Sequence, residues 1–224
     1  MRHVRVRCRR RVFAVATTQL GAGARPPGGI MERPLIAVFG SSTVKEPDPV
    51  YRLALDLGGE LGRAGAGVMT GGYGGTMEAC SRGAHEAGGL VVGVTVELFE
   101  KRGPVNRWVR QRIHTPSLFE RLRYLVEHAV GFVVLPGSIG TLTELFLTWT
   151  LLSAEGRPHA PLVLLGEHWD GFLTVLNHPD RVLPELFRYV EVASSPRDAA
   201  VRALSTWRSA APDRAPKAEG AARA

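Results

Sequence analysis

Arg121, Glu144 and three glycine-rich turns are the parts of this sequence whose residue types and spacing suit chemistry. The segment "VLPGSIGTLTE", residues 134–144, passes from an apolar run through glycines straight into a helix-forming stretch. Such a junction commonly holds a phosphate, because the first N–H groups of a helix are unpaired and carry partial positive charge. Glu144 follows Gly140 by four residues and would project from the first turns of that helix. Phosphate binding alone leaves this carboxylate unexplained.

The three turns are "GSST", "TGGYGGT" and "PGSIGT", each following an apolar run. Each turn alone is weak evidence, because glycines also serve tight connections between strands and helices. Neither a Walker A sequence nor a G-x-G-x-x-G fingerprint is present, which excludes a P-loop NTPase. Together the turns predict a phosphate or nucleotide pocket built from backbone N–H groups and hydroxyls. Its expected residues are Gly40, Ser41, Ser42, Gly71, Gly72, Gly75, Gly137, Ser138, Gly140 and Thr141.

Both charged residues also have plainer interpretations. A glutamate near the start of a helix often only compensates the helix dipole. Arg121 begins the helix before the last turn and could reach an anionic substrate, but a solvated arginine is the commoner case. On the residues alone, these alternatives stay open.

Apolar runs and helical spacing alternate along the chain. Strands, some with their turns, are expected at 35–40, 66–72, 90–96, 130–137 and 160–166, with an edge strand at 188–193. Helices are expected at 48–65, 75–89, 117–129, 141–154, 169–177 and 195–204. Ser117 and Glu120 form a capping-box pattern. The polar stretch 97–112 interrupts the alternation and is expected to be a mobile loop.

This alternation predicts an α/β protein with a Rossmann-like, doubly wound parallel sheet and helices on both faces. In such sheets ligands bind beyond the carboxyl ends of the strands, near the switch in strand order, so the three turns should converge there. We expect a single nucleotide-binding domain over 31–209. A disordered basic extension over 1–30 should precede it, and a disordered tail over 210–224 should follow it.

The net charge of +7 arises at one end of the chain, because residues 1–30 hold seven arginines and no acid. The 21 basic and 21 acidic residues that follow cancel, which argues against nucleic-acid binding by the domain. The basic segment is either a targeting sequence or, as we favour, an extension before a natural start at Met31. Cys8 and Cys80 do not suggest a disulfide framework, and no apolar run could span a membrane. A cytoplasmic protein is expected.

The ordered motifs "VFGSS", "GGYGGTMEACSRGAHEAGGLVVGV", Arg121 and "PGSIGTLTE" resemble the LOG family of cytokinin riboside 5′-monophosphate phosphoribohydrolases, often described as possible lysine decarboxylases. The resemblance covers roughly residues 34–171, and "PGSIGTLTE" is similar to the family signature P-G-G-x-G-T-x-x-E. It implies a Rossmann-like fold, a homodimer, and cleavage of a nucleoside 5′-monophosphate to free base and ribose 5-phosphate.

Carried over to this sequence, the resemblance implies that Arg121 and Glu144 are catalytic and that Gly137, Gly140 and Thr141 hold the phosphate. There are departures: Ser138 stands where the family has its second glycine, and Leu122 replaces the lysine of an Arg-Lys pair. Glu78, in "GGTMEA", resembles a variant in relatives whose substrates are less settled, and we include it among the binding residues. The base therefore stays open.

Three competing functions can be weighed against this expectation. A pyridoxal-dependent lysine decarboxylase needs a lysine in a buried pocket, and the only lysines are Lys45, Lys101 and Lys217, none of which follows a core strand. A non-catalytic nucleotide or cofactor carrier would explain the glycine turns but leave the Arg121 and Glu144 pair idle. Nucleic-acid binding through residues 1–30 would be lost on deleting them.

The sequence suggests no cofactor or metal, because its histidines are scattered and none forms a ligand pair at zinc spacing. The helix after the last glycine turn carries apolar residues that suit either a dimer face or the core. These residues are Leu145, Phe146, Trp149 and Leu152.

Overall fold

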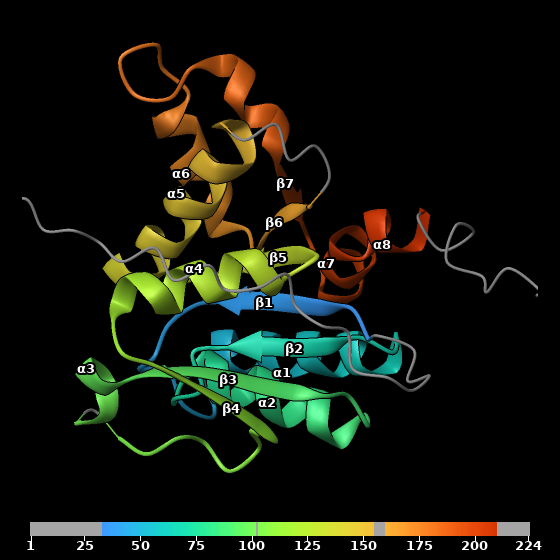
Figure 1. The fold of residues 1–224 in the computed structure, drawn as a ribbon. Coiled ribbons are helices and arrows are strands. Elements are labelled where there is room, and N and C mark those ends of the chain that lie inside the picture. Colours follow the sequence, from blue (N-terminus) through green and yellow to red (C-terminus); the bar gives the residue numbers. More distant parts are fainter. Residues whose placement is uncertain (1–32, 102, 155–159, 210–224) are drawn as a thin grey trace, which may run out of the picture. The chain divides into compact units, whose positions relative to one another are not determined.

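The computed structural model describes residues 33–101, 103–154 and 160–209 (Figure 1). Within these ranges the chain forms one seven-stranded sheet. Its strands are β1 (Leu35–Phe39), β2 (Gly67–Thr70), β3 (Val91–Val96), β4 (Gln111–Thr115), β5 (Gly131–Val134), β6 (Leu162–Leu165) and β7 (Val190–Ala193). All neighbouring strands pair in parallel, which confirms the predicted sheet.

The helices follow the strands in the alternation that the sequence predicts. They are α1 (Pro49–Arg63), α2 (Thr76–Glu86), α3 (Glu97–Glu100), α4 (Leu118–His128), α5 (Ile139–Ala154), α6 (His168–Leu176), α7 (Pro196–Ala203) and α8 (Ser205–Ser209), with a 3-10 helix, η1 (Pro184–Tyr189). At the start of α4 the hydroxyl of Ser117 accepts a hydrogen bond from the N–H of Glu120, as the capping-box pattern predicts. No helix in the described part of the chain is long and apolar enough to cross a membrane.

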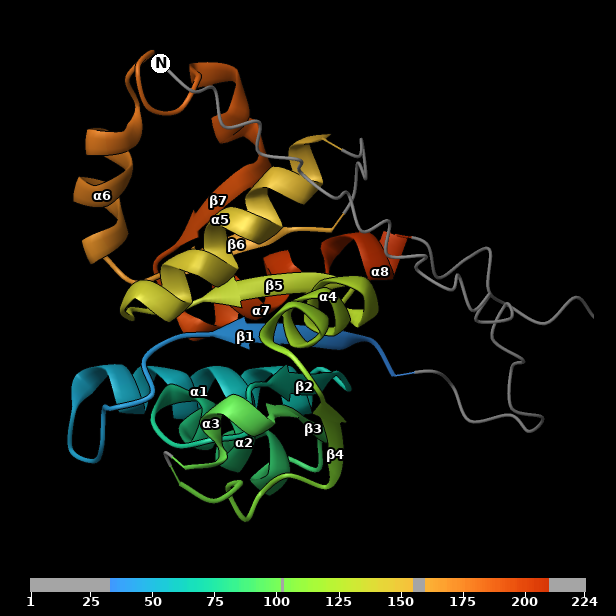
Figure 2. The ribbon, with the colours of Figure 1, turned by 60° about the vertical axis from the view of Figure 1, so that its left-hand side comes forward.

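The strand order, β4-β3-β2-β1-β5-β6-β7, places the switch in chain direction between β1 and β5. The chain builds outward from β1 to β4 and then returns to the other side of β1 with β5. Figures 1 and 2 both show β4 with α3 at one end of this series and β7 with α6 at the other. The loops after β1 and β5 therefore leave the sheet side by side, where doubly wound proteins bind ligands.

Alternating side chains of each strand serve two separate cores. Ile36 and Val38 pack with α1, α2 and α7, whereas Ala37 and Phe39 pack with α4, α5 and α6. Because both faces of the sheet are buried, the central strands are continuous apolar runs, and the expected helices on both faces are confirmed.

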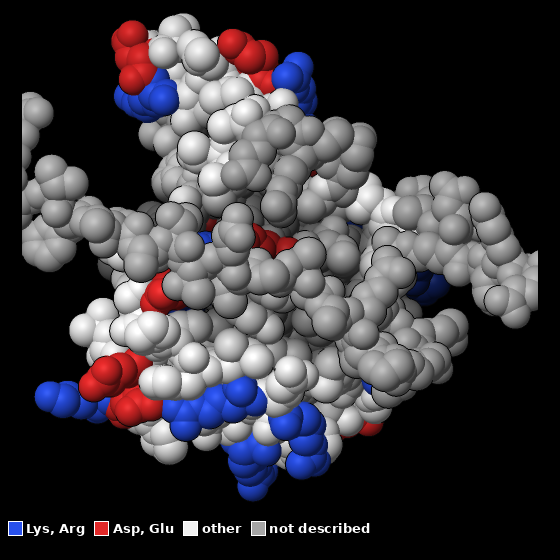
Figure 3. All heavy atoms as spheres, viewed as in Figure 1, with Lys and Arg blue, Asp and Glu red and all other residues white. Residues whose placement is uncertain are grey.

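The prediction of a mobile loop over 97–112 is wrong in two places. Residues 97–100 form α3, and Gln111 begins β4, which pairs with β3 from Val92↔Gln111 to Val96↔Thr115. Gln111, Arg112 and His114 are exposed on this edge strand, so its sequence lacks an apolar run. Figure 3 shows Lys and Arg side chains gathered over the region where Figure 1 places β4. Charges on an open edge oppose pairing with other chains.

The expected edge strand over 188–193 is confirmed as β7, which pairs with β6. The predicted basic extension, 1–30, and tail, 210–224, lie outside the described residues.

Candidate active site at the switch point

Ser41 joins the three glycine-rich turns. Its N–H donates to the carbonyl of Pro136 at 3.0 Å, which links the turn after β1 to the turn after β5. Its carbonyl accepts from the N–H of Thr76 at 2.8 Å and from the Thr76 hydroxyl at 3.0 Å, which links the same turn to the start of α2. The three turns thus meet at the carboxyl edge of the sheet.

Close backbone approach explains glycines in each turn. A Cβ on Gly75 would collide with the carbonyl of Ser41, and Gly75 has a φ of 72°. A Cβ on Gly137 would collide with the hydroxyl of Thr141, and one on Gly40 would lie 2.5 Å from the Thr76 hydroxyl. These glycines let the turns pack against one another, which larger residues would prevent.

The N-terminus of α5 supplies the backbone donors of the candidate site. Gly137, Ser138, Ile139 and Gly140 are exposed there, and the first intrahelical bond runs from Leu142 N–H to Ser138. The N–H groups before Leu142 have no carbonyl one turn earlier in the helix to accept their hydrogen bonds. They are therefore available to donate hydrogen bonds to an anion. By contrast, the N–H of Gly72 already donates to the Thr70 hydroxyl at 3.0 Å.

Arg121, in the first turn of α4, reaches across the ends of β3 and β2. Its Nε donates to the carbonyl of Val94 at 2.9 Å. This carbonyl is accessible because β2 pairs with β3 only as far as Thr70↔Gly93. The guanidinium lies directly over Gly71, where a Cβ would collide with Nη2. Only 4% of Arg121 is exposed, so the arginine is a fixed part of the interior and not a solvated side chain.

Glu144 completes a buried ion pair with this arginine. Nη1 of Arg121 donates to Oε1 of Glu144 at 3.1 Å, and 5% and 13% of the two side chains are exposed. Glu144 lies in the second turn of α5, one turn after Thr141. Burial raises the pKa of Glu144 above its ordinary value, and the opposing effect of Arg121 does not cancel the rise. A carboxylate with a raised pKa is a better base at neutral pH.

Glu144 and the exposed N-terminal turn of α5 therefore share one helix, whereas Arg121 comes from α4. The N-terminus of α5 can hold a phosphate, while Glu144 faces Arg121 deeper in the same edge. This arrangement can bind a phosphorylated ligand and present it with a carboxylate that has little contact with water. Such a site can stabilise positive charge that develops on the ligand.

Other predicted residues make contacts elsewhere. Glu78 is half-buried in the first turn of α2. The pKa of Tyr51 on α1 is raised first by the burial of Tyr51 and second by the charge of the Glu78 carboxylate. Glu78 therefore faces the α1 side of the sheet. Ser42 is exposed, and the hydroxyl of Ser41 lies 3.1 Å from that of Thr43. The assigned roles of these residues in binding stay predictions.

Sequence reasoning missed three residues that build the site: Thr76, which holds Ser41, and the aromatic residues Tyr73 and Phe99. Tyr73 lies inside the second glycine turn and is 8% exposed. Phe99 lies in the segment expected to be a loop, and Arg121 Cζ is 5.8 Å from the centroid of its ring. An aromatic inside "GGYGG" is a signal that could have been used, since a flexible turn does not need it.

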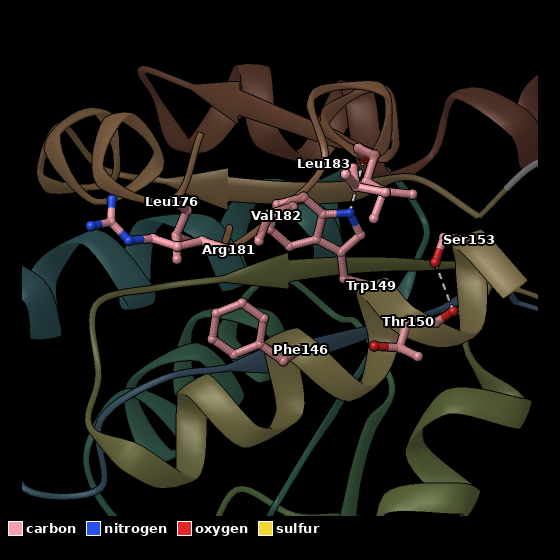
Figure 4. A pocket seen from close by; sticks show the side chains of 9 residues that line it. Phe146, Trp149, Thr150, Ser153, Leu176, Arg181, Val182 and Leu183 are labelled. Atoms are coloured by element: carbon pink, nitrogen blue, oxygen red, sulfur yellow. Dashed lines mark hydrogen bonds between the residues drawn. The ribbon is translucent and has the colours of Figure 1, made fainter. Parts of the chain in front are cut away.

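A separate groove of about 520 Å³ lies on the flank of α5, between it and residues 176–186 (Figure 4). Trp149 and Phe146 line it, and the Trp149 indole N–H donates to the carbonyl of Leu186 at 2.9 Å. Leu145, Trp149 and Leu152 are buried in the core, whereas Phe146 is only partly buried. Of the four α5 residues considered for a dimer face, three are therefore core residues.

The fold and site define a doubly wound α/β protein with a buried arginine–glutamate pair beside the exposed N-terminus of α5 at its switch point. A family model described as "Possible lysine decarboxylase" matches residues 77–203. The chain belongs to this family, the LOG family.

Two curated relatives carry the name cytokinin riboside 5′-monophosphate phosphoribohydrolase. The one from Mycobacterium tuberculosis is 33% identical over 136 residues, which cover 58% of this chain and 72% of the relative. One from Arabidopsis thaliana is 29% identical over 126 residues, which cover 55% of this chain and 59% of the relative. The matched residues thus span nearly three quarters of the first relative and about three fifths of the second.

Solved structures with the same fold include proteins of another kind. A molybdenum cofactor binding protein from Rippkaea orientalis is 25% identical with a TM-score of 0.58, covering 75% of this chain and 94% of that one. The molybdenum cofactor carrier protein of Chlamydomonas reinhardtii is 23% identical with a TM-score of 0.60, covering 79% and 99%. The latter similarity bears on the fold alone.

Proposed function

We propose that this protein hydrolyses the N-glycosidic bond of a nucleoside 5′-monophosphate, releasing the free base and ribose 5-phosphate. The observation that carries the proposal is the buried ion pair between Arg121 and Glu144 beside the N-terminus of α5. The names of the mycobacterial and plant relatives support it. A binding protein would have no evident use for a buried carboxylate of raised pKa at this place.

In this mechanism the N-terminus of α5 binds the 5′-phosphate and so fixes the ribose. Water attacks the anomeric carbon, the bond to the base breaks, and the base leaves with the bonding electrons and takes up a proton. Positive charge develops on the sugar in the transition state, by analogy with glycosidases. The Glu144 carboxylate stabilises that charge or orients the water, while Arg121 holds the carboxylate in place.

The family description of lysine decarboxylase finds little support in the described residues. Pyridoxal chemistry requires a lysine that can form a Schiff base in a protected pocket. Lys45 and Lys101 are both exposed, and Lys217 lies outside the described residues.

The alternative function is a non-catalytic nucleotide or cofactor carrier. It is favoured by one observation, the 25% identity and shared fold with the molybdenum cofactor binding protein of Rippkaea orientalis. A carrier would bind a phosphorylated ligand at the α5 N-terminus and leave it intact.

The decisive experiment incubates the protein with a panel of nucleoside 5′-monophosphates and measures free base and ribose 5-phosphate. The panel should include cytokinin riboside 5′-monophosphates, because the relatives from Mycobacterium tuberculosis and Arabidopsis thaliana are named for them. Tight binding of one monophosphate without cleavage would establish the carrier.

Glu144→Gln tests the catalytic assignment within this experiment. We expect it to lower kcat by about 10²–10⁴-fold, since it removes the charge that the transition state needs. Glu127→Gln is the matched control, because it breaks a surface ion pair with Arg123 whose atoms lie 2.9 Å apart. Full activity in Glu144→Gln would refute the assignment while leaving the enzyme class intact.

The homodimer implied by the family resemblance is also a proposal. The groove beside Phe146 offers an apolar surface for it, and Phe146→Glu should then weaken the dimer. Sedimentation velocity of the wild type and the variant measures this. A wild-type monomer at micromolar concentration would contradict it.

A further inference from the structure

The short helix α3 places one aromatic ring against the catalytic arginine. Phe99 is the partly buried residue of α3, whereas Glu97, Leu98 and Glu100 are exposed. Arg121 Cζ lies over the Phe99 ring, 5.8 Å from its centroid. A guanidinium over an aromatic face is attracted by the ring quadrupole, more strongly where water is excluded. Phe99 therefore contacts Arg121, whose guanidinium is already confined by Gly71 and by the carbonyl of Val94.

Tyr73 holds the Phe99 ring from behind. The two rings meet edge to face, with centroids 6.2 Å apart and planes at 76°. The Tyr73 hydroxyl donates to the carbonyl of Val96 at 2.9 Å and accepts from its N–H at 3.1 Å. These bonds fix Tyr73 to the residue that directly precedes α3. The second glycine turn and α3 are thereby joined through one buried phenol.

The segment after α3 is tied to the same turn. The N–H of Asn106 donates to the carbonyl of Gly72 at 2.9 Å, and its side-chain amide donates to the carbonyl of Tyr73 at 3.0 Å. The polar segment thus has anchors on both sides of Phe99, at Val96 and at Asn106. Phe99 is presented by a braced structure and not by a loose loop.

The donors of Arg121 explain why a ring is useful here. Nε is bound to Val94, Nη1 to Glu144, and Nη2 rests on Gly71. The Phe99 ring adds a further contact, at the guanidinium carbon Cζ. An aromatic side chain opposes displacement of the cation by its size and by its attraction to the charge.

We propose that Phe99 is a positioning residue for the catalytic ion pair: its ring, backed by Tyr73, holds the Arg121 guanidinium against Glu144. This inference rests on the proposed hydrolysis. Phe99 acts through Arg121, so its loss should lower kcat and leave the KM for the monophosphate nearly unchanged.

The kinetic test compares three variants on the monophosphate that the wild type cleaves fastest. Phe99→Leu keeps an apolar side chain but removes the ring, and we expect kcat to fall about twofold to thirtyfold with KM within about twofold. Phe99→Tyr keeps the ring and should retain most of the wild-type kcat. Leu98→Ala, a neighbour that is 65% exposed, should behave as the wild type. Equal kcat in Phe99→Leu and the wild type, or an equal loss in Leu98→Ala, would overturn the proposal.

A second measurement does not depend on catalysis. In protein labelled with ¹⁵N-arginine, the Nε–H signal of Arg121 is assigned by its absence in Arg121→Lys. This N–H is buried and bonded to Val94, so it should exchange slowly with water in the wild type and in Phe99→Tyr and faster in Phe99→Leu. If no monophosphate is cleaved, this signal decides alone, and equal exchange in all three proteins refutes the positioning role. If Phe99→Leu does not fold, Phe99→Met replaces it with the same expectations.

Discussion

One layer of helices covers each face of the sheet. The helices within the two layers contact their neighbours by different means. On one side α1 and α2 touch through their backbones: a Cβ on Gly58 would collide with the carbonyl of Cys80, and one on Gly83 with that of Leu55. On the other side α4 and α5 are linked by two charged side chains, Arg121 and Glu144. The first layer contributes stability, and the second carries the polar groups of the candidate site.

Glycine therefore does opposite things on the two sides of the sheet. Between α1 and α2, Gly58 and Gly83 have no side chain, which lets the two helices approach closely. At the end of β2, Gly71 leaves space that the Arg121 guanidinium fills. The same added methyl group should thus lower stability in one place and catalytic activity in the other.

Gly71→Ala should have the largest effect, on activity. The new Cβ would collide with Nη2 of Arg121 and lie 2.7 Å from the sulfur of Met77. Displacing the guanidinium breaks its bonds to Glu144 and Val94, and we expect kcat/KM to fall by about 10²–10³-fold. Activity assays and thermal unfolding measure the two consequences separately. Gly171→Ala, where a Cβ meets no atom within 4 Å, is the control. Undiminished activity in Gly71→Ala would show that the position of Arg121 does not matter.

Gly83→Ala should act on stability instead. Its Cβ would meet the backbone of α1, which cannot move aside without separating the helices, and overpacking of this kind costs about 1–3 kcal/mol. Urea unfolding measures this loss. At temperatures where the variant is folded, its activity should match the wild type. Lost activity in a fully stable Gly83→Ala protein would contradict the separation of the two layers.

The extent of successful prediction from sequence also differs between regions. The inner strands are continuous apolar runs, and they were predictable because burial on both faces leaves a direct mark on sequence. The edge strand β4 was missed, since Gln111, Arg112 and His114 face solvent and its formation depends on pairing with β3. The convergence of the glycine turns followed from parallel topology, which the strand order confirms.

The contacts inside the site were less accessible to sequence reasoning. Arg121 and Glu144 could be singled out, but the bond from Arg121 to Val94 exists because β3 extends beyond β2, and no local pattern encodes that difference. Likewise, Ser41 was chosen for its hydroxyl, whereas its N–H and carbonyl are the groups that join the turns. Such contacts follow from the relative position of elements, which single-residue patterns do not specify.

The contribution of Glu144 to stability should depend on pH. Burial holds the pKa of Glu144 above its ordinary value of 4.5 in the folded state. The folded protein therefore binds this proton more tightly than the unfolded chain does, so the contribution of Glu144 to stability is full at low pH. It decreases as the pH rises from 4.5 through the raised pKa.

Urea unfolding between about pH 4 and pH 8 tests this sign. The free energy of unfolding of the wild type, minus that of Glu144→Gln, should decline with rising pH, because glutamine does not titrate. A difference that increases with pH would mean that the ion pair with Arg121 outweighs burial. In that case Glu144 would be a poorer base than its buried position suggests.

Ser138→Gly should have the smallest effect, and it separates the phosphate binding proposed for the α5 N-terminus from the role of the ion pair. Ser138 is exposed at the start of α5, and its carbonyl accepts the first intrahelical bond of α5, from Leu142. Replacing a serine by glycine at such a capping position costs only a few tenths of a kcal/mol. The glycine would remove a Cβ at the proposed phosphate site, so KM should change by about threefold or less while kcat stays constant. Steady-state kinetics separates the two constants. A change confined to kcat would place Ser138 in the chemistry of Glu144 and not in the anchoring of the phosphate.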